Sequence, residues 1–308
     1  MFEQKNLQPY SHIKIGGIAE YFSEPKTIND LVMVVAAARK LSRPIFILGG
    51  GTNILFRNSG LRGAVVKPSV MTLRRDGDFL RVGSSVLIAQ LLDYSITHSL
   101  SGLEWAGGLP GTVGGAIYGN AGAFRGEIKD SVVNVVSVDI AKKNPTIVRR
   151  SSSECGFDYR SSIFKENTGK EIIVEALLRL PAGNKKAIRS AIHENIKYRE
   201  DRQPLIHPNI GSIFKNVDLR KIPKAQHGLF SHVIKTDPFP VVPTAHLIAE
   251  AGLKGVSCGG AMISPKHPNF IVNILDATAV DVLNLIDLVK QRVKRKFGIV
   301  LEEEVIIV

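Results

Sequence analysis

A glycine-rich segment at residues 101–126 limits the folds that this chain can adopt. Nine of its 26 residues are glycine, against 28 glycines in all 308 residues, and it contains GGLPGTVGGA at 107–116 and NAG at 120–122. Because glycine lacks a Cβ, its backbone can approach another segment or a ligand closely, and Pro110 stiffens the run by fixing its own φ. The segment therefore predicts either a tight crossing of the chain or a rigid wall for an extended cofactor.

A second glycine cluster, at residues 49–53, follows Ile45 to Leu48, a stretch with the pattern of a buried strand. The backbone amides of such a turn can converge on an anion, and Thr52 and Asn53 add side-chain donors. The GxGxxG spacing of a Rossmann fold and the Gly-Lys-Ser/Thr of a Walker A loop are both missing. A mobile turn is the alternative, but two clusters at strand ends favour one extended dinucleotide held between them.

Two helices have clear start signals in the sequence. Thr27 and Asp30 form a capping-box pattern, and the apolar residues that follow recur at helical spacing. Thr278 and Asp281 repeat the pattern at the start of a helix predicted over 278–297. Helices are also expected over 86–99, from 184 to about 199, and near 244–251.

Strand signals alternate with these helices, which predicts an α+β fold with mixed sheets. Asp76-Gly77 lies between the apolar stretches 71–74 and 79–82, a strong signal for a hairpin. Further strands are expected at residues 64–67, 132–138, 171–180, 212–216, 270–275 and 300–308.

The run Pro181-Ala182-Gly183 is typical of a domain boundary. It predicts a first domain over 1–181, with subdomains of about 1–67 and 68–181, and a second domain over 182–308.

Charge and composition narrow the classes of function. The chain has 40 Lys and Arg against 28 Asp and Glu, so its net charge is +12, which suits an anionic small molecule as well as nucleic acid. Aromatic residues make up only 6% of the chain, which counts against a nucleic-acid-binding module. The two cysteines, the polar first residues and the short apolar runs predict a reduced, cytoplasmic protein without membrane insertion.

A series of motifs in order along the chain carries a resemblance to a known family. The motifs are IGG at 15–17, GGGTNIL at 49–55, GLRGAVV at 60–66, GLEWAGGLPGTVGGAIYGNAGAFRGEI at 102–128, DYRSSIFK at 158–165, GSIFKN at 211–216, EAGLKG at 250–255, GGAMISPKHPNFIVN at 259–273 and FGIVLEEEV at 297–305. The glycine clusters resemble the flavin-binding domain of the vanillyl-alcohol oxidase type. The whole series resembles the UDP-N-acetylenolpyruvoylglucosamine reductases, flavoenzymes that make UDP-N-acetylmuramate for peptidoglycan.

This resemblance implies a flavin-binding domain and a smaller α+β substrate-binding domain. It implies that NADPH reduces FAD, that the reduced flavin gives hydride to the enolpyruvyl double bond of UDP-N-acetylglucosamine enolpyruvate, and that a serine protonates the other carbon. We expect a non-covalently bound FAD, because no histidine lies at the glycine clusters to tether it, and we expect a monomer.

The resemblance also implies three catalytic residues. Arg160 matches the catalytic arginine, whose paired donors suit a carboxylate that gains charge during the reaction. Ser212 matches the proton-donating serine, and an extended 212–216 segment would place Asn216 on the same face as Ser212. Glu304 matches the glutamate that polarises the carboxylate together with the arginine, although Glu302 and Glu303 stand so close that the register is open.

The remaining site residues follow from the same match, which implies no metal site. The cofactor-binding residues implied are Gly49, Gly50, Gly51, Thr52, Asn53, Gly108, Pro110, Gly111, Thr112, Gly114, Gly115 and Gly122. The substrate-binding residues implied are Tyr159, Lys215, Asn216 and His267, with a structural or surface role as the alternative for the histidine. The chain departs from the family pattern at Val217, at Ile306 and in a long 218–243 connection.

The sequence is also compatible with two rival functions. Another flavoenzyme with the same type of domain, such as an oxidase of sugars or phenols, would share the glycine clusters but not GSIFKN or LEEEV. A basic nucleic-acid-binding module would share only the charge. Bound flavin would exclude the nucleic-acid-binding module. NADPH oxidation that depends on the enolpyruvyl sugar nucleotide would distinguish the reductase from another flavoenzyme.

Overall fold

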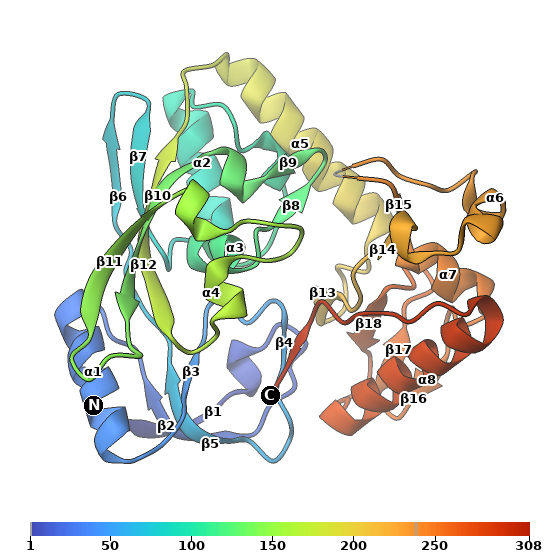
Figure 1. Cartoon of the computed structure of the whole chain (residues 1–308), viewed down its shortest axis with the longest axis horizontal. Coiled ribbons are helices and arrows are strands. Elements are labelled where there is room, and N and C mark those ends of the chain that lie inside the picture. The colour runs from blue at the N-terminus through green and yellow to red at the C-terminus, as the bar shows by residue number, and fades with distance from the viewer. Residues whose placement is uncertain (1, 238) are drawn as a thin grey trace. The chain divides into compact units, whose positions relative to one another are not determined.

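The computed structural model describes residues 2–237 and 239–308, which divide into two compact units (Figure 1). The first unit consists of the chain up to Lys5, Ala19–Gly50 and Leu61–Tyr198. The second consists of Asn6–Ile18, Gly51–Gly60 and Arg199–Val308. Two short stretches near the N-terminus therefore belong with the C-terminal part, and the last boundary falls after Tyr198, within a helix.

The first unit begins with a four-stranded sheet in the order β1-β2-β5-β3. Its strands are β1 (Glu3–Asn6), β2 (Ile18–Ser23), β3 (Ile45–Ile47) and β5 (Leu61–Val66), and β5 is parallel to both β2 and β3. Helix α1 (Ile28–Lys40) lies between β2 and β3 in the chain. The predicted capping box of Thr27 and Asp30 is present, and α1 buries Leu31, Val34, Val35 and Ala38.

The second sheet of this unit is five-stranded and antiparallel, in the order β11-β10-β12-β7-β6. Its strands are β6 (Leu73–Asp76), β7 (Phe79–Gly83), β10 (Val132–Asp139), β11 (Thr146–Ser151) and β12 (Glu171–Arg179). The predicted hairpin forms one residue further on than expected. Asp76 still pairs with Phe79, so Gly77 and Asp78 make the two-residue loop, with Gly77 at φ +57°.

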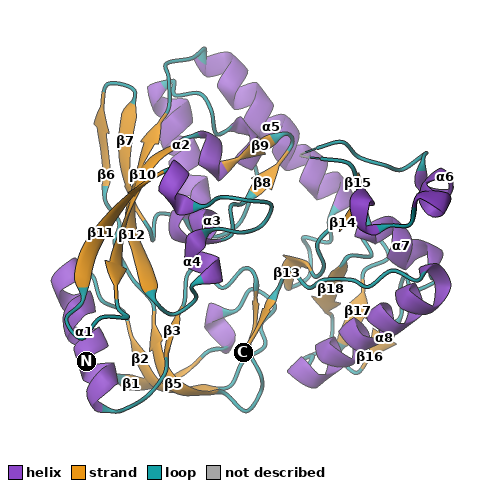
Figure 2. Ribbon diagram, in the orientation of Figure 1, coloured by secondary structure: helices purple, strands orange, loops and turns teal. Residues whose placement is uncertain are grey.

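The glycine-rich segment and four helices complete the first unit (Figure 2). The helices are α2 (Ile88–His98), α3 (Val113–Tyr118), α4 (Ile163–Glu166) and α5 (Lys185–Arg202), and β8 (Gly122–Ala123) pairs with β9 (Gly126–Glu127). Short 3-10 helices lie at Glu104–Ala106, Ile128–Asp130 and Ser153–Cys155. Trp105 is buried in the apolar core formed here, so the segment folds as a packed part of the unit.

The second unit is built on an antiparallel sheet in the order β13-β18-β17-β16. Its strands are β13 (Asn209–Ser212), β16 (Ser257–Cys258), β17 (Ala261–Ile263) and β18 (Phe270–Asn273), and its helices are α6 (His227–Phe230), α7 (Thr244–Glu250) and α8 (Ala279–Phe297). The predicted capping box of Thr278 and Asp281 starts α8, and Gly298 at φ +70° ends it. Val282, Leu285, Ile286, Val289 and Val293 form its buried side, as predicted.

Short elements tie the distant parts of this unit together. Strand β4 (Ile54–Leu55) is parallel to β19 (Ile306–Ile307), and β14 (Val217–Asp218) is antiparallel to β15 (Val241–Val242). Three 3-10 helices lie at Gln8–Tyr10, Leu219–Lys221 and Lys224–Gln226. Among the described residues of the 218–243 connection, 219–221, 224–226 and α6 are helical, and Phe230 joins the core.

Two strand predictions were wrong in extent. Within 300–308 only β19 is a strand, because the chain before it makes a single bridge from Glu303 to Phe214. Within 212–216 the strand ends at Ser212, and Ile213 and Phe214 are both buried at 1% exposure instead of alternating. No helix of the described chain is both long enough and apolar enough to span a membrane.

Candidate active site

The two glycine clusters meet inside the first unit. A Cβ on Gly50 would lie 2.9 Å from the Cα of Gly111, and one on Gly49 would lie 3.3 Å from Oγ1 of Thr112. Gly111 has φ +109°, which a residue with a side chain rarely adopts. Thr112 caps helix α3, because its Oγ1 accepts a hydrogen bond from the backbone N–H of Gly115. The backbones of the two loops therefore touch, as the sequence predicted for clusters that act together.

Backbone amides of both loops are available to a ligand. Among the described residues, the N–H groups of Gly49 and Gly50 donate no hydrogen bond to the protein, and the same holds for Gly108, Gly111 and Thr112. In the second unit the N–H groups of Gly51, Thr52 and Asn53 are equally unused by described partners. Within the first unit, unused amides in glycine loops of this kind are the donors that a dinucleotide pyrophosphate needs. The residues present therefore fit FAD.

At some of the other predicted cofactor-binding positions, packing within the protein also explains whether glycine is needed. Gly114 packs on Ser84, because its N–H donates to the Ser84 carbonyl at 2.8 Å and a Cβ would lie 2.8 Å from the Ser84 Cβ. Gly51 has φ +66°, and a side chain there would collide with the Tyr10 carbonyl. The nearest atom to a Cβ on Gly115 is Oγ1 of Thr112 at 3.5 Å, so this position has room.

Arg160 sits in a strained turn of the first unit. Asp158 and Ser161 exchange two backbone hydrogen bonds, of 3.1 and 3.0 Å, and Arg160 between them has φ +54°. The left-handed conformation costs a residue with a Cβ about 1–2 kcal/mol. The Nη2 of Arg160 donates to the Gly122 carbonyl at 2.6 Å. A side chain held in a strained backbone by its own hydrogen bonds is typical of a functional position.

Asn120 and Gly122 support this turn from the glycine-rich segment. Asn120 is fully buried, and its Nδ2 donates to the Asp158 carbonyl at 3.0 Å. A Cβ on Gly122 would lie 3.3 Å from Nη1 of Arg160, so the glycine makes room for the guanidinium. The guanidinium carbon also lies 5.2 Å from the centre of the Tyr159 ring. Sequence reasoning missed Asn120, whose partner is 38 residues away in the chain.

Ser212 ends strand β13 in the second unit. Gly211 before it has φ +80°, and the pairing of β13 with β18 shifts by one residue between Asn209 and Ser212. Such a bulge turns the strand locally and can re-aim a side chain. The next residue, Ile213, donates its N–H to the carbonyl of Asn269 at 2.8 Å.

The three adjacent glutamates separate clearly in this unit. Glu302 forms an ion pair with Lys215 and lies 3.7 Å from Lys221, and the hydrogen bond from Lys215 is the main cause that lowers the pKa of Glu302. Glu303 pairs with Lys290 at 2.7 Å. Of the three, Glu304 is bonded closest to Ser212 along the chain, because its N–H donates to the carbonyl of Ile213, the next residue, at 2.8 Å. This register favours Glu304 as the residue that works beside Ser212.

The predicted substrate-binding residues of this unit are held in defined positions. Asn216 accepts a hydrogen bond from the Thr244 N–H at 3.2 Å, and Oγ1 of Thr244 donates to the Lys215 carbonyl at 2.6 Å. His267 is half-buried, with its ring edge-on to Phe270 at 4.7 Å between centres. Burial lowers the pKa of His267 to about 4, so its ring is neutral at pH 7.

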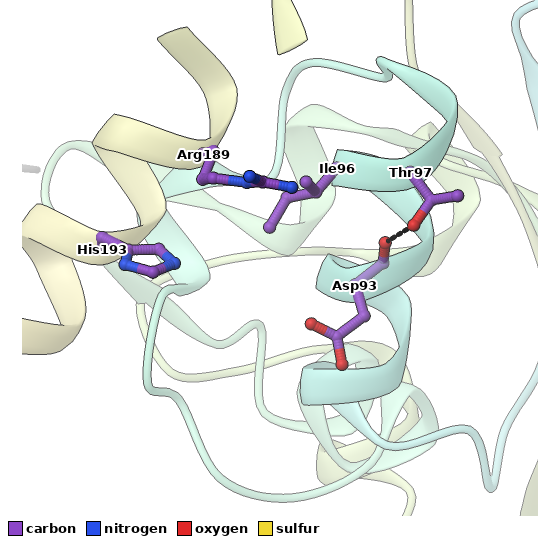
Figure 3. Close-up of a pocket in the computed structure, with 5 residues that line it drawn as sticks. All are labelled: Asp93, Ile96, Thr97, Arg189 and His193. Carbon is purple, nitrogen blue, oxygen red and sulfur yellow. Dashed lines mark hydrogen bonds between the residues drawn. The ribbon is translucent and has the colours of Figure 1, made fainter. Parts of the chain in front are cut away.

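A surface pocket of about 390 Å³ lies elsewhere in the first unit, between α2 and α5 (Figure 3). It is lined by Asp93, Ile96, Thr97, Arg189 and His193. None of these belongs to the glycine clusters or to the Arg160 turn. Over residues 2–237 and 239–308, no group of three or more His, Cys, Asp or Glu side chains could hold a metal ion.

Comparisons with known proteins agree with these features. Residues 19–151 match the family model described as "FAD binding domain", and residues 203–308 match the C-terminal domain of UDP-N-acetylenolpyruvoylglucosamine reductase. The fold and the FAD-binding match define an FAD-dependent oxidoreductase, so the predicted α+β flavoprotein class is confirmed.

Full-length relatives give the family. The chain is 36% identical to the UDP-N-acetylenolpyruvoylglucosamine reductase of Caldanaerobacter subterraneus subsp. tengcongensis, over 100% of this chain and 93% of the relative. It is 37% identical to that of Anoxybacillus flavithermus, over 99% and 93%. The solved UDP-N-acetylenolpyruvylglucosamine reductase of Thermus caldophilus has a TM-score of 0.78 at 28% identity, over 100% and 98%. The chain belongs to the UDP-N-acetylenolpyruvoylglucosamine reductase family, and the predicted resemblance is confirmed.

Proposed function

We propose that this chain reduces UDP-N-acetylglucosamine enolpyruvate to UDP-N-acetylmuramate for peptidoglycan precursor synthesis, with FAD as bound cofactor and NADPH as the source of electrons. The observation that carries the proposal is the backbone hydrogen bond between Ile213 and Glu304, which ties the residue after Ser212 to the glutamate. It occurs in a chain that is related to named reductases over its full length.

The cofactor would be held by the glycine loops. The free amides of Gly49, Gly50, Gly111 and Thr112 would bind the pyrophosphate, and the glycine backbone lets it approach closely. The remaining predicted members of this set, Gly51, Thr52, Asn53, Gly108, Pro110, Gly114, Gly115 and Gly122, stay proposals. Bound FAD, once reduced by NADPH, would supply hydride to the enolpyruvyl double bond.

The three predicted catalytic residues take separate parts in the reduction. Ser212 gives a proton from its hydroxyl to the carbon that does not receive hydride. Arg160 binds the neighbouring carboxylate, whose charge grows as the enol-like intermediate forms, and its planar donors suit that group. Glu304 acts with the arginine in polarising the carboxylate. The left-handed backbone of Arg160 and its bond to Gly122 support this role, since both fix the guanidinium before substrate arrives.

We also propose roles for the predicted substrate-binding residues. Lys215 offers a cation to the diphosphate, and Asn216 and Tyr159 offer polar contacts. His267 would act as a neutral ring, because burial keeps it unprotonated. In the same way we propose that 1–181 carries the flavin and 182–308 the sugar nucleotide, and that the enzyme works as a monomer in the cytoplasm.

The proposal is tested by following NADPH oxidation at 340 nm with FAD-loaded protein. Oxidation should depend on UDP-N-acetylglucosamine enolpyruvate, and UDP-N-acetylglucosamine, which lacks the double bond, should support none. The product should carry a lactyl ether in place of the enolpyruvyl group by mass spectrometry. NADPH oxidation at equal rates with both sugar nucleotides would reject the proposed reaction.

A further inference from the structure

The backbone that follows Ser212 is held by one buried side chain, that of Asn269. Asn269 is 3% exposed and directly precedes strand β18. Its Oδ1 accepts a hydrogen bond from the Phe214 N–H at 3.0 Å, and its Nδ2 donates to the Phe214 carbonyl at 2.8 Å. Its own carbonyl accepts the Ile213 N–H at 2.8 Å. The side-chain amide thus takes the place of a strand residue beside Phe214.

The other edge of the same backbone is held by the C-terminal segment. The Ile213 carbonyl accepts from Glu304, and the Lys215 N–H donates to the Glu302 carbonyl at 2.9 Å. Residues 213–215 therefore lie between Asn269 on one edge and 302–304 on the other. Strand β13 has already ended at Ser212, so no regular ladder holds this stretch on the Asn269 edge.

We infer that Asn269 is a positioning residue, which fixes the peptide units after Ser212 and through them the serine hydroxyl and the backbone of Glu304. This inference rests on the proposed function, because it assumes that Ser212 donates a proton. Three hydrogen bonds from one residue to two adjacent residues leave the segment little freedom to slide or rotate. A misplacement of about 1 Å at a reacting group can cost on the order of 100-fold in rate.

The chemistry of the contact requires an amide. Asparagine offers one acceptor and two donors, so it can satisfy the N–H and the carbonyl of Phe214 at once. An ionised aspartate of the same size only accepts, so its oxygen would face the Phe214 carbonyl without a hydrogen bond. An alanine would leave both buried groups of Phe214 unpaired, and such groups are costly to bury.

The experiment uses the full-length FAD-loaded protein with Asn269→Asp and Asn269→Ala. The matched control is Asn273→Asp. Asn273 is also buried, and its Nδ2 donates to the Ile13 carbonyl at 3.0 Å and not to the backbone that follows Ser212. Stopped-flow absorbance follows flavin bleaching by NADPH and flavin recovery on adding the enolpyruvyl sugar nucleotide. We expect recovery to slow by roughly 10- to 100-fold in the Asn269 variants. Bleaching should keep its wild-type rate, and the control should change neither step.

A double mutant distinguishes a positioning role of Asn269 from a merely structural one. If Asn269 acts through Ser212, adding Asn269→Ala to Ser212→Ala should slow recovery no further, because the group being positioned is already gone. Equal fractional slowing in both backgrounds would overturn the inference, and so would equal slowing of bleaching and recovery. Failure of both single variants to fold would assign Asn269 to the fold of the unit and overturn the positioning role.

The same measurements distinguish this inference from the proposed function. Wild-type protein whose flavin does not recover with the enolpyruvyl sugar nucleotide would reject the function itself. Recovery in wild type, with equally fast recovery in the Asn269 variants, would reject only the positioning role.

Discussion

The backbone N–H of Glu304 donates a 2.8 Å hydrogen bond to the carbonyl of Ile213. The two residues are far apart in the sequence, yet this bond sets the register in which Glu304, of three adjacent glutamates, lies opposite the residue that follows Ser212. Glu302 and Glu303 point their carboxylates to lysines instead. The backbone of Glu304 is held from a second direction, because its carbonyl accepts from Nδ2 of Asn53 at 3.0 Å.

Glu304→Gln should slow substrate reduction without unfolding the protein. The glutamine keeps the size and leaves the backbone bond to Ile213 intact, but it removes the carboxyl group that we assign, together with Arg160, to polarising the substrate carboxylate. We expect a loss of about 10²- to 10³-fold in turnover, the scale for one preorganised group. Steady-state NADPH oxidation measures the loss. Glu303→Gln is the control, and an equal loss there would mean that the register assigned here is wrong.

Arg160→Lys should not restore function, although it keeps the positive charge. Lysine lacks the planar paired donors, and it cannot reproduce the bond to Gly122 together with a carboxylate contact. We expect the activation free energy of substrate reduction to rise by about 2–4 kcal/mol. Stopped-flow measurements of the rate at which the substrate reoxidises the reduced flavin test this value. Near-normal turnover would show that Arg160 supplies charge alone.

Two neighbouring glycines of helix α3 should respond differently to substitution. Gly114→Val should lower the melting temperature and weaken FAD binding, because a Cβ would press on Ser84 at 2.8 Å. Gly115→Ala should keep the fold, since the nearest atom to its Cβ is 3.5 Å away. Thermal unfolding and flavin titration of the two variants make the comparison. Equal stability of the two would contradict the packing of Gly114 on Ser84.

Local signals in the sequence predicted the elements that depend on few residues. The capping boxes of Thr27 and Thr278 were found because the donor and acceptor lie three residues apart. The meeting of the glycine clusters was predicted because both lack side chains and both were expected at strand ends. The second expectation was wrong for the cluster at 107–116, which follows the 3-10 helix Glu104–Ala106, while the cluster at 49–53 does follow a strand, β3. The resemblance supplied the family and the candidate catalytic residues, which no local pattern could have given.

Long-range contacts could not be predicted in the same way. The strand expected over 300–308 is mostly absent, because Glu302 and Glu304 bond to the irregular stretch 213–215 and only Ile306–Ile307 pair with a strand. The alternation expected at 212–216 fails, because Ile213 and Phe214 are both buried. Asn269 and Asn120 act on backbone groups tens of residues away, so their spacing carries no signal that a sequence pattern could reveal.

Acid should destabilise the protein partly through His267. Burial holds its pKa at about 4, below the ordinary 6.5, so the unfolded state binds a proton first as pH falls. The contribution of this group to stability is present above about pH 6.5 and is lost as pH drops toward 4, with a slope of up to about 1.4 kcal/mol per unit. Urea unfolding of wild type and His267→Gln between pH 7 and 4.5 tests it. Parallel pH curves for the two proteins would contradict the burial of a neutral ring.

Ser212→Ala is the sharpest test of the proposed reaction, since it should separate two steps that share one flavin. NADPH should still bleach the yellow colour at close to the normal rate, because hydride transfer from nicotinamide needs no serine. Recovery of the colour with the enolpyruvyl sugar nucleotide should slow by about 10²- to 10⁴-fold or more, the range for a positioned acid. Substrate affinity should change little, because the hydroxyl acts mainly in the transition state.

Ser257→Ala, which changes an exposed serine of the same unit, is the control and should alter neither step. If both steps slow together, Ser212 matters for flavin position or folding, and if neither slows, the proton comes from another group, with Glu304 the first to examine.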